Sequence, residues 1–429
     1  MAARNQLAMA PPDPAALPRL LPSTPDPSLS AHLARLGPLP RTGSGLRQEI
    51  VASGLRGRGG SGIPTGTKME AVAGNSRLKR STVVANGTEG EPASGKDQVL
   101  LQNTPHLVLD GIVAAAGAVG AREAVLCVDR RHHAAIESVN RALAERTGPH
   151  ADPIEIRLVL APNRYVAGEE TALIHWINGG EAKPTTTPPR PFEKGVGGRP
   201  TLVDNVETLA HVALIARFGS RWFRGLGTAD EPGSVLLSVS GHASNGGVME
   251  VPIGLPLTSV LRMAGTDLDQ LGAVLVGGYF GSWIDVATAA SVTASHASLR
   301  AVGGSLGCGV VFALPRGRCG LAETARVARW LAGENAGQCG PCMNGLPAMA
   351  DAMDHLVAGG RHAAWALLRL QELFGLVEGR GACRHPDGAV RLVRSALQVF
   401  AADAQAHAHG RPCAPSPAWL PAPAPGGWR

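Results

Sequence analysis

The chain of 429 residues has a mass of 44.2 kDa, with 44% hydrophobic residues, 17% charged residues and a formal net charge of +6. This composition supplies apolar side chains for two or three folded domains and excludes disorder over most of the length. The basic residues are scattered among acids and aromatic residues make up only 4%, which argues against a nucleic-acid-binding protein.

No segment has the pattern of a membrane span or a secretion signal. The longest apolar runs, such as 112–121, are about half of the ~20 residues that a membrane-spanning helix needs, so we expect no membrane insertion. The first residues lack a positive region followed by an apolar stretch, which predicts a cytoplasmic protein. In that compartment the seven cysteines are expected as thiols or metal ligands rather than disulfides.

The first half of the chain alternates helix and strand patterns. Residues 1–41 are rich in Pro, Ala and Ser and predict an extended arm with one short helix near 30–36. Residues 42–233 form an α/β region, because such alternation is typical of a mostly parallel sheet covered by helices on both faces. We expect helices at 46–53, 105–120, 133–146 and 170–178, and strands at 82–85, 124–128 and 154–160.

The second half predicts two further domains and a tail. Residues 234–318 form a small α+β domain, with strands at 234–240, 248–251, 273–276 and 309–313 and a helix at 257–264. Residues 319–404 predict an antiparallel helical bundle, with helices at 322–331, 346–358, 363–376 and 389–404. Residues 405–429, rich in Pro and Ala, predict a disordered tail.

A glycine-rich loop at 57–68 is the first candidate for ligand binding. Residues 57–62 match G-x-G-x-x-G, but a helix rather than a strand is expected before them, so the match to a dinucleotide-binding fingerprint is weak. Glycines allow backbone N–H groups to converge on an anion, and Lys68 adds a positive charge. The loop therefore predicts an anion site or, alternatively, a flexible surface loop.

Acidic side chains follow the strands or begin the helices of the α/β region. Glu89 and Glu91 come directly after the strand at 82–85, where α/β sheets place ligands, although a solvated turn has the same pattern. The segments 165–171 and 204–208 each open a helix, and acids in a first turn also simply complement the helix dipole. For each segment alone, both interpretations stay open.

Cysteines gather in the helical region. Cys339 and Cys342 form a C-x-x-C motif, and Cys383 follows 41 residues later across the bundle. Three such thiols would hold most of an iron–sulfur cluster, with no fourth ligand evident. The other cysteines are expected in the core, at Cys127, Cys308 and Cys319, or in the tail, at Cys413.

Five motifs in this order resemble one family, the flavin- and NADH-binding F-type subunit of NADH-quinone oxidoreductases (complex I), which NAD-linked hydrogenases and formate dehydrogenases share. The motifs lie at 54–62, 89–92, 165–171, 205–208 and 339–342. The resemblance covers about 45–400 and implies three domains: a Rossmann-like FMN/NADH domain, a ubiquitin-like β-grasp domain and a helical bundle with a 4Fe-4S cluster. It implies hydride transfer from NADH to FMN, then single electrons to the cluster and to an electron-acceptor protein, either ferredoxin-like or another oxidoreductase subunit.

The resemblance also implies roles for individual residues. Glu91 and Glu170 would be catalytic, at the flavin and nicotinamide. The FMN phosphate would be held by Gly59, Gly60, Gly62 and Lys68. The other cofactor-binding residues would be Asn86, Glu89, Tyr165, Gly168, Glu169, Asp204 and Asn205, and the cluster ligands Cys339, Cys342 and Cys383.

This chain departs from the family at the cluster. Ala336 stands where the family has the first cluster cysteine, and alanine cannot ligate iron. Three cysteines allow a three-iron cluster, a four-iron cluster with a foreign ligand, or none. Glu334, Asn335 and His385 are the nearby candidates for the missing contact.

It departs again at the nucleotide pocket. Aromatic residues of the family are replaced by Ile63, Ala71 and Arg190, a lysine by Thr187, and a flavin-contacting aspartate by Thr88. Lost aromatic stacking weakens dinucleotide binding. Three functions therefore remain open: an NADH dehydrogenase module, a flavoprotein electron carrier that has lost NADH use, and a scaffold without redox activity.

Overall fold

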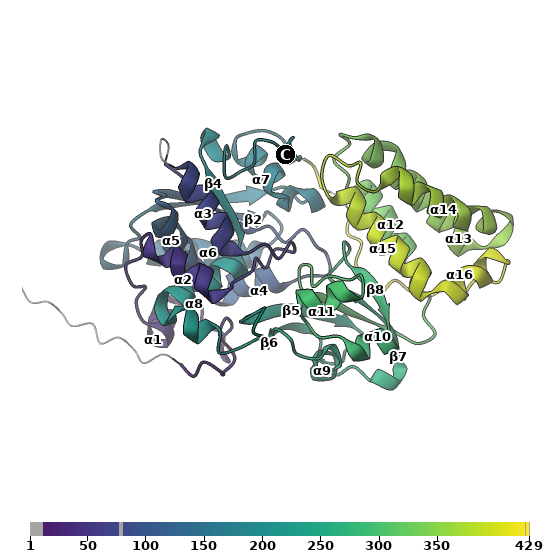
Figure 1. Ribbon diagram of the computed structural model, residues 1–429, viewed down its shortest axis with the longest axis horizontal. Helices are drawn as coiled ribbons and strands as arrows, with labels where there is room; N and C mark the ends of the chain where they lie inside the picture. Colours follow the sequence, from purple (N-terminus) through teal and green to yellow (C-terminus); the bar gives the residue numbers. More distant parts are fainter. Residues whose placement is uncertain (1–11, 77–79, 425, 429) are drawn as a thin grey trace, which may run out of the picture.

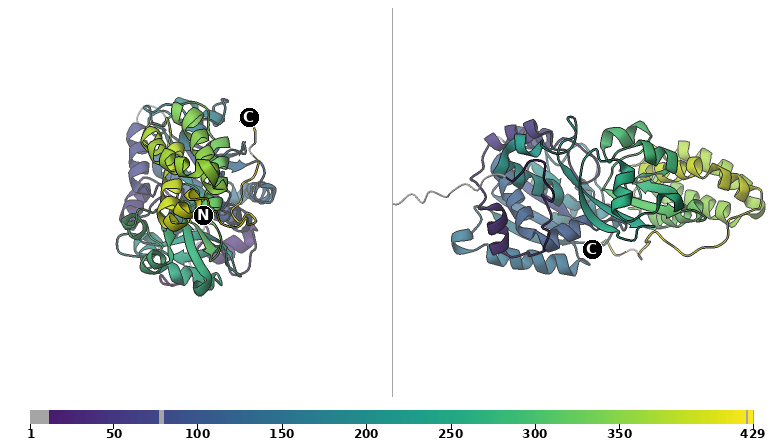
Figure 2. Two further views of the ribbon diagram at one scale, coloured as in Figure 1. Left: turned by 90° about the vertical axis from the view of Figure 1, so that its right-hand side faces the viewer. Right: turned by 90° about the horizontal axis from the view of Figure 1, so that it is seen from below.

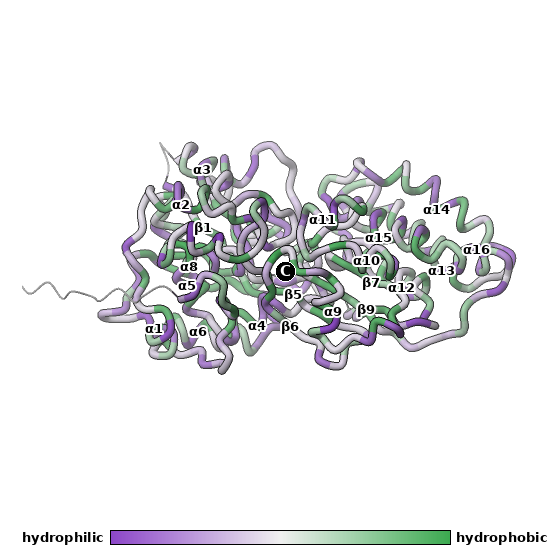
Figure 3. Tube along the Cα trace, turned by 60° about the horizontal axis from the view of Figure 1, so that its bottom comes forward, coloured by the Kyte–Doolittle hydropathy of each residue, from purple (hydrophilic) through white to green (hydrophobic). Residues whose placement is uncertain are grey.

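The computed structural model describes residues 12–76, 80–424 and 426–428. An α/β region occupies one end of an elongated molecule, a second sheet lies in the middle, and a helical bundle forms the other end (Figure 1). Figure 3 shows hydrophobic segments concentrated around the central strands. Among the described residues, no helix combines the length and apolarity needed to cross a bilayer.

Four parallel strands form the first sheet, in the order β3-β2-β1-β4. Their bounds are Thr82–Gly87 for β1, Glu123–Asp129 for β2, Glu155–Ala161 for β3 and Thr201–Asn205 for β4. The strands β1 and β2 are almost entirely buried, as expected for parallel strands that helices cover on both faces. The predicted parallel α/β sheet is therefore confirmed, and β4 is an additional strand.

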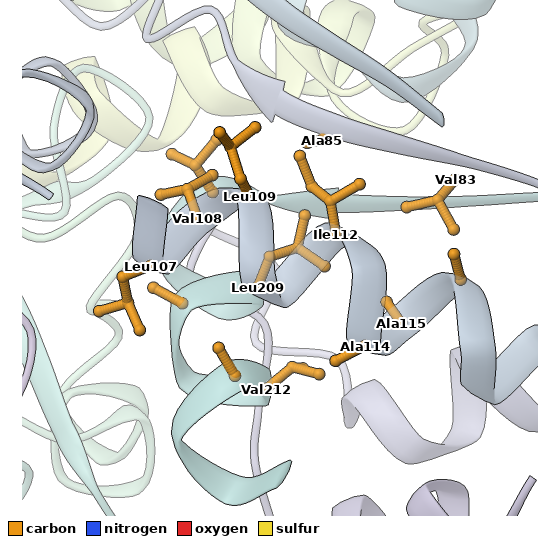
Figure 4. Close-up of a cluster of buried hydrophobic side chains, with 14 of the residues drawn as sticks. Val83, Ala85, Leu107, Val108, Leu109, Ile112, Ala114, Ala115, Leu209 and Val212 are labelled. Atoms are coloured by element: carbon orange, nitrogen blue, oxygen red, sulfur yellow. The ribbon is translucent and has the colours of Figure 1, made fainter. Parts of the chain in front are cut away.

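Helix packing against this sheet builds the largest core. The helices are α2 (Gly45–Ser53), α3 (Thr65–Asn75), α4 (Lys96–Asn103), α5 (Pro105–Val119), α6 (His133–Glu145), α7 (Glu170–Ile177) and α8 (Val206–Phe223). Ile112 of α5 lies between Val83 of β1 and Leu209 of α8 (Figure 4). Gly111 makes this close approach possible, because a Cβ there would overlap the Leu209 carbonyl oxygen. The sheet is thereby held against α5 and α8 as one rigid support for the loops at its edge.

The second sheet is mixed, in the order β6-β5-β9-β7-β8. Its strands are β5 (Ser234–Gly241), β6 (Gly247–Pro252), β7 (Leu271–Val276), β8 (Ser282–Asp285) and β9 (Val310–Pro315). The β5 and β9 strands are parallel and the other pairs antiparallel. Three short helices accompany it, α9 (Leu257–Met263), α10 (Val286–Ser291) and α11 (His296–Ala301). This small α+β unit agrees with the predicted fold class.

The C-terminal helices form a bundle, as predicted. They are α12 (Gly320–Gly333), a π-helical segment (Pro341–Gly345), α13 (Leu346–Ala358), α14 (Ala363–Val377), α15 (His385–Val399) and α16 (Ala401–Ala408). Leu331, Met353 and Leu392 come from different helices and are fully buried in one core. The single helix expected over 389–404 is two helices, because Phe400 leaves helical geometry.

The N-terminal arm is docked on the α/β region. Its helix α1 (Leu29–Leu36) matches the predicted short helix. Leu20 is fully buried in the core, and the Arg19 guanidinium stacks 4.1 Å from the Trp222 ring centroid. The described part of the arm is thus fixed by specific contacts.

The structure differs from the expectation of a disordered tail over 405–429. Residues 405–408 belong to α16, and the described residues that follow run back from the bundle towards the α/β region (Figure 2). Leu420 is 3% exposed, the Trp330 indole donates to the Pro423 carbonyl at 2.7 Å, and the Trp428 ring stacks 4.1 Å from the Arg164 guanidinium. Apolar anchors among the prolines hold the tail, and the prolines reduce the entropy lost on ordering it.

Candidate functional site

A cavity of about 700 Å³ opens at the carboxyl ends of β1 and β4. Its walls come from all three parts of the molecule: the α/β loops, the segment 277–308 of the second-sheet region and the start of α15. Every predicted cofactor residue except Gly62 lines it. Segments remote in sequence therefore converge on one site.

The glycine loop forms one wall through its backbone. Gly59 is packed so that a Cβ would lie 3.3 Å from the Asn205 Cβ, and Gly60 has a positive φ of 117°. Gly62, with a φ of 63°, lies instead against His296, whose ring a Cβ would meet at 2.8 Å. Gly59 and Gly60 thus border the cavity, whereas Gly62 shapes the turn behind it.

Lys68 and Asp204 form an ion pair beside this loop. The Lys68 Nζ lies 3.2 Å from Asp204 Oδ1 and also donates to the Val203 carbonyl. Burial raises the pKa of the Asp204 carboxyl, and Lys68 opposes that shift. The other oxygen, Oδ2, is buried and has no hydrogen-bond partner among the described residues. It is a free acceptor in a residue that lines the cavity.

Glu91 is held by groups from two other parts of the chain. Its Oε2 accepts hydrogen bonds from the Tyr165 hydroxyl at 3.0 Å and the Tyr279 N–H at 2.8 Å, and Oε1 accepts from the Ala93 N–H at 3.3 Å. Burial outweighs these bonds and raises the pKa of Glu91 to about 7. Glu91 is therefore a cavity carboxyl that can change protonation near neutral pH.

Glu89 has a different task from its neighbour. Its carboxylate accepts from the N–H groups of Asp97 and Gln98, each at 2.9 Å, in the first turn of α4. Reaching them requires a φ of 44°, the positive-φ backbone that only Glu89 adopts among the described non-glycine residues. Burial raises its pKa to about 7. Glu89 borders the cavity but its oxygens are engaged in helix capping.

Glu169 and Glu170 are adjacent in sequence but have different roles, since one caps a helix and the other faces the cavity. Glu169 caps α7, because its Oε2 accepts from the N–H groups of Thr171 and Ala172, each at 3.0 Å. The Glu170 carboxylate makes no hydrogen bond or ion pair with any described residue, and Glu170 lines the cavity. Of the two, Glu170 has the carboxylate free for a ligand.

Two polar side chains connect β1 and β4 at the cavity floor. The Asn86 amide donates to the Gly168 carbonyl at 2.8 Å, and Thr88, which replaces the family aspartate, donates to Asn86 Oδ1 at 2.8 Å. The Asn205 amide donates to the Asn86 carbonyl at 3.2 Å. These bonds fix the shape of the floor.

Lys96 is a residue of the site that the sequence patterns did not predict. Its side chain is only 2% exposed, and its Nζ lies 2.6 Å from Asp97, 2.9 Å from Glu207 and 3.1 Å from Asn205. This buried cation at the cavity wall is thus satisfied in part by residues more than 100 positions away. The sequence contained a hint of this role. The chain has only five lysines against 35 arginines, so a lysine marks a position where arginine was not used.

Cys308 was expected in the apolar core, and this expectation is wrong. It lines the cavity, with its thiol 3.7 Å from the Gly277 carbonyl. Burial and the neighbouring Glu91 raise its pKa well above the ordinary value, so it is a neutral thiol. Cys127 and Cys319 are buried, as predicted.

The three predicted cluster cysteines lie near one another in the bundle. Cys342, in the π-helical segment, has its pKa raised to about 12 by burial and then by the adjacent Cys339 and Cys383. Cys383 also lines the main cavity, so the set of three cysteines lies next to the cavity. Ala336 is buried beside Cys342 and offers no ligand atom.

Of the three candidates for a fourth cluster contact, two are engaged elsewhere. The Glu334 carboxylate accepts from the Tyr165 N–H at 2.7 Å, and Asn335 Oδ1 accepts from the Gly337 N–H at 2.8 Å. His385 uses Nε2 to donate to the Leu331 carbonyl at 2.8 Å, while its Nδ1 is buried without a partner among the described residues. Burial lowers the pKa of His385 to about 4.

The positions where the resemblance implies aromatic residues or a lysine are open to solvent to different degrees. Ile63 lines the cavity and is 46% exposed. Ala71 lies on α3 outside the cavity wall, and Thr187 and Arg190 are exposed in a loop. The entrance to the cavity thus has an aliphatic side chain in place of a ring.

Comparison with known proteins identifies a chain that combines a flavin-binding domain with an iron–sulfur region. Residues 50–214 match the Nuo51 FMN-binding domain, and residues 322–407 match the NADH-ubiquinone oxidoreductase-F iron-sulfur binding region. An F-type subunit of NADH-quinone oxidoreductase from Rhizobium meliloti (strain 1021) is 32% identical over 376 residues, which are 85% of this chain and 89% of that protein. The F-type subunit from Mycobacterium tuberculosis (strain ATCC 25618 / H37Rv) is 30% identical, over 85% of this chain and 84% of that one. The chain belongs to this family of NADH-quinone oxidoreductase subunits.

A solved structure has the same fold. The NAD+-reducing NiFe hydrogenase in its H2-reduced state superposes with a TM-score of 0.78 at 30% identity, covering 92% of this chain and 67% of that chain. Its air-oxidized state gives a TM-score of 0.77, covering 87% of this chain and 64% of that one. The chain thus spans about two thirds of those hydrogenase chains.

Proposed function

We propose that this protein is an FMN-dependent NADH dehydrogenase module that accepts hydride from NADH and passes electrons to an iron–sulfur centre and a partner. The observation that carries the proposal is the cavity of about 700 Å³ in which every cofactor residue predicted by the resemblance except Gly62 comes together. Membership of the family of F-type NADH-quinone oxidoreductase subunits supports the same activity.

The residues of the cavity fit FMN. Backbone N–H groups around Gly59 and Gly60, with Lys68 beside them, suit a phosphate group. The buried Asp204 Oδ2 lacks a partner among the described residues and would accept a ring or ribityl donor. When bound, FMN supplies hydride acceptance and release of single electrons. The protein supplies binding, orientation and electrostatics.

Two carboxyl groups of this cavity are suited to proton handling. Glu91 can hold or release a proton near neutral pH, and the Tyr165 hydroxyl fixes its orientation. Glu170 is free to bind a ligand group, because Glu169 performs the capping of α7. Glu91 and Glu170 are therefore the proposed catalytic pair.

Cys339, Cys342 and Cys383 are the proposed ligands of the iron–sulfur centre, and the matched iron–sulfur region supports them. They fit a cluster with three protein ligands, since Ala336 contributes none. When bound, such a cluster carries single electrons. The residues thus supply a site next to the cavity wall, because Cys383 belongs to both.

We propose another subunit of an oxidoreductase complex, or a ferredoxin-like protein, as the electron acceptor. The names of the relatives support the first of these, since each is a subunit of a larger enzyme. A cytoplasmic location fits seven free cysteines, because a reducing compartment preserves thiols and clusters.

A second candidate function is a flavoprotein electron carrier that no longer uses NADH. The observation that favours it is Ile63, 46% exposed at the cavity where the resemblance implies an aromatic ring. A lost stack costs about 1 kcal/mol, which weakens nucleotide binding about fivefold.

An anaerobic titration of the FMN-loaded protein with NADH distinguishes these functions. Bleaching of the flavin absorption band near one equivalent of NADH is the result expected for the dehydrogenase. Bleaching by reduced ferredoxin but not by NADH would establish the electron carrier instead. Failure to take up FMN at all would contradict both and leave the scaffold function.

A further inference from the structure

A second group of metal-ligand side chains lies in the bundle, apart from the three predicted cluster cysteines. The Cys319 and Cys413 sulfurs and a ring nitrogen of His407 all lie within 4.8 Å of one another. Cys319 precedes α12, His407 is in α16, and Cys413 is in the tail. Three segments therefore meet at one point of the bundle.

His407 is oriented as metal-binding histidines are. Its ring is 1% exposed, and Nδ1 lies 3.2 Å from the Leu356 carbonyl, to which it donates. That bond fixes the tautomer and leaves Nε2 as the lone-pair nitrogen, 3.8 Å from the Cys319 sulfur. The Cys413 N–H now donates to this lone pair at 2.9 Å, a contact that a metal ion would replace.

The spacing fits tetrahedral zinc. With Zn–S of about 2.3 Å and Zn–N of about 2.0 Å, a tetrahedron places sulfur and nitrogen about 3.5 Å apart. Cys319 also occupies the N-terminal cap position of α12, at the positive end of the helix dipole. Cys413 is exposed, so water can reach a fourth position.

We propose that Cys319, His407 and Cys413 bind one Zn²⁺ ion, with water as the fourth ligand, and that the ion fastens the C-terminal tail to the bundle. Two thiolates and an imidazole are a donor set that zinc prefers. Cys319 and Cys413 lie outside the matched iron–sulfur region at 322–407, so this site is additional to it.

Fastening the tail has a consequence for the main site. Beyond Cys413 the chain continues through buried Leu420 to Pro421 and Pro423, which line a pocket of about 490 Å³. Glu91 lines the same pocket, as well as the main cavity. The zinc would thus hold the segment that closes the far side of Glu91.

Cobalt titration of the full-length protein tests the proposal. The protein is treated with chelator under anaerobic conditions and titrated with Co²⁺, whose thiolate charge-transfer band reports binding. Because Cys339, Cys342 and Cys383 also bind metals, C413S is compared with the matched control C383S. We expect Co²⁺ binding at the Cys319–His407–Cys413 site to be lost in C413S and retained in C383S. In the wild type and in C383S, Zn²⁺ should displace the Co²⁺ from this site. Equal Co²⁺ content and spectra in C413S and the wild type would overturn the proposal.

Limited proteolysis measures whether Zn²⁺ holds the tail against the bundle. Chymotrypsin cleavage after the partly exposed Trp419 of the tail, followed by mass spectrometry, should be at least tenfold slower with Zn²⁺ in the wild type and in C383S, but unchanged by Zn²⁺ in C413S. If oxidation joins Cys319 to Cys413 in a disulfide and no metal is bound, the zinc proposal is wrong. Neither readout uses flavin or NADH, so the result is independent of the proposed activity.

Discussion

The Tyr165 hydroxyl donates a hydrogen bond of 3.0 Å to Glu91 Oε2, across 74 residues of sequence. The Tyr165 ring packs edge-on against Phe280 at 4.7 Å and Trp330 at 5.2 Å between centroids. The first of these rings belongs to the second-sheet region and the other to the bundle. One tyrosine therefore couples the proposed catalytic carboxyl to the packing of the whole molecule.

The raised pKa of Glu91 predicts a pH-dependent stability. Because its pKa in the folded protein is about 7, above the ordinary value of 4.5, its contribution to stability is full below about pH 4.5 and is lost as pH rises through 7. E91Q removes this ionisation. We expect the free energy of unfolding of the wild type to fall relative to E91Q by about 2 kcal/mol between pH 5.5 and 8.5.

Urea denaturation of the flavin-free protein at several pH values measures this difference. Glu89 has a similarly raised pKa but is present in both proteins, so the comparison isolates Glu91. Parallel stability curves for the wild type and E91Q would show that Glu91 is already ionised in the folded state.

Glu169 and Glu170 should respond differently to the same change. E169Q weakens the cap of α7 and should lower stability by about 1 kcal/mol in thermal or urea denaturation. E170Q should leave stability within about 0.5 kcal/mol, yet reduce NADH-dependent turnover at least tenfold, because its carboxylate is free in the cavity. The reverse pattern would assign the ligand contact to Glu169.

Removal of the Lys68 charge should weaken flavin binding. In K68M the cation beside the glycine loop is lost, and we expect the Kd for FMN, followed by flavin fluorescence, to rise at least tenfold. The control K194M changes a lysine on the exposed surface outside the cavity. An equal effect of both variants would mean that only net charge matters.

A cysteine at position 336 should complete the iron–sulfur site. Reconstituted A336C is expected to keep four irons per chain during mild oxidation, whereas the wild type, with three thiols, loses one. Iron analysis and electron paramagnetic resonance measure the outcome. A332C places a thiol at another buried alanine four residues earlier and serves as control. Identical behaviour of wild type and A336C would exclude position 336 from the site.

Elements with a strong periodic pattern were predictable, and those fixed by tertiary packing were not. The apolar run at 82–85 identified β1, and the helix expected at 105–120 is α5. Helix α3 was missed because its sequence, TGTKMEAVAGN, has low helix propensity; burial of Met69 and Val72 stabilises it. Strand β8 has only four residues, too few for a pattern.

Sequence patterns pointed to many of the residues that line the cavity, but not to Lys96 or Cys308 and not to which carboxylates cap helices. Which acid of each pair caps a helix depends on backbone geometry, since Glu89 reaches α4 only with a positive φ. The burial of Lys96 depends on Glu207, which lies 111 positions later. Such pairings arise from the topology of the sheet, so no local pattern contains them.

The docked tail is one of the last parts of the described chain that can fold during synthesis. Synthesis starts at the N-terminus, so the strands and helices around the glycine loop can fold before Pro421, Pro423 and Trp428 have been made. The side of Glu91 that faces the tail then stays uncovered until residues 421–428 have been synthesised and Trp428 reaches Arg164. The nascent protein therefore passes through a period in which this side of the site is open to cofactor delivery.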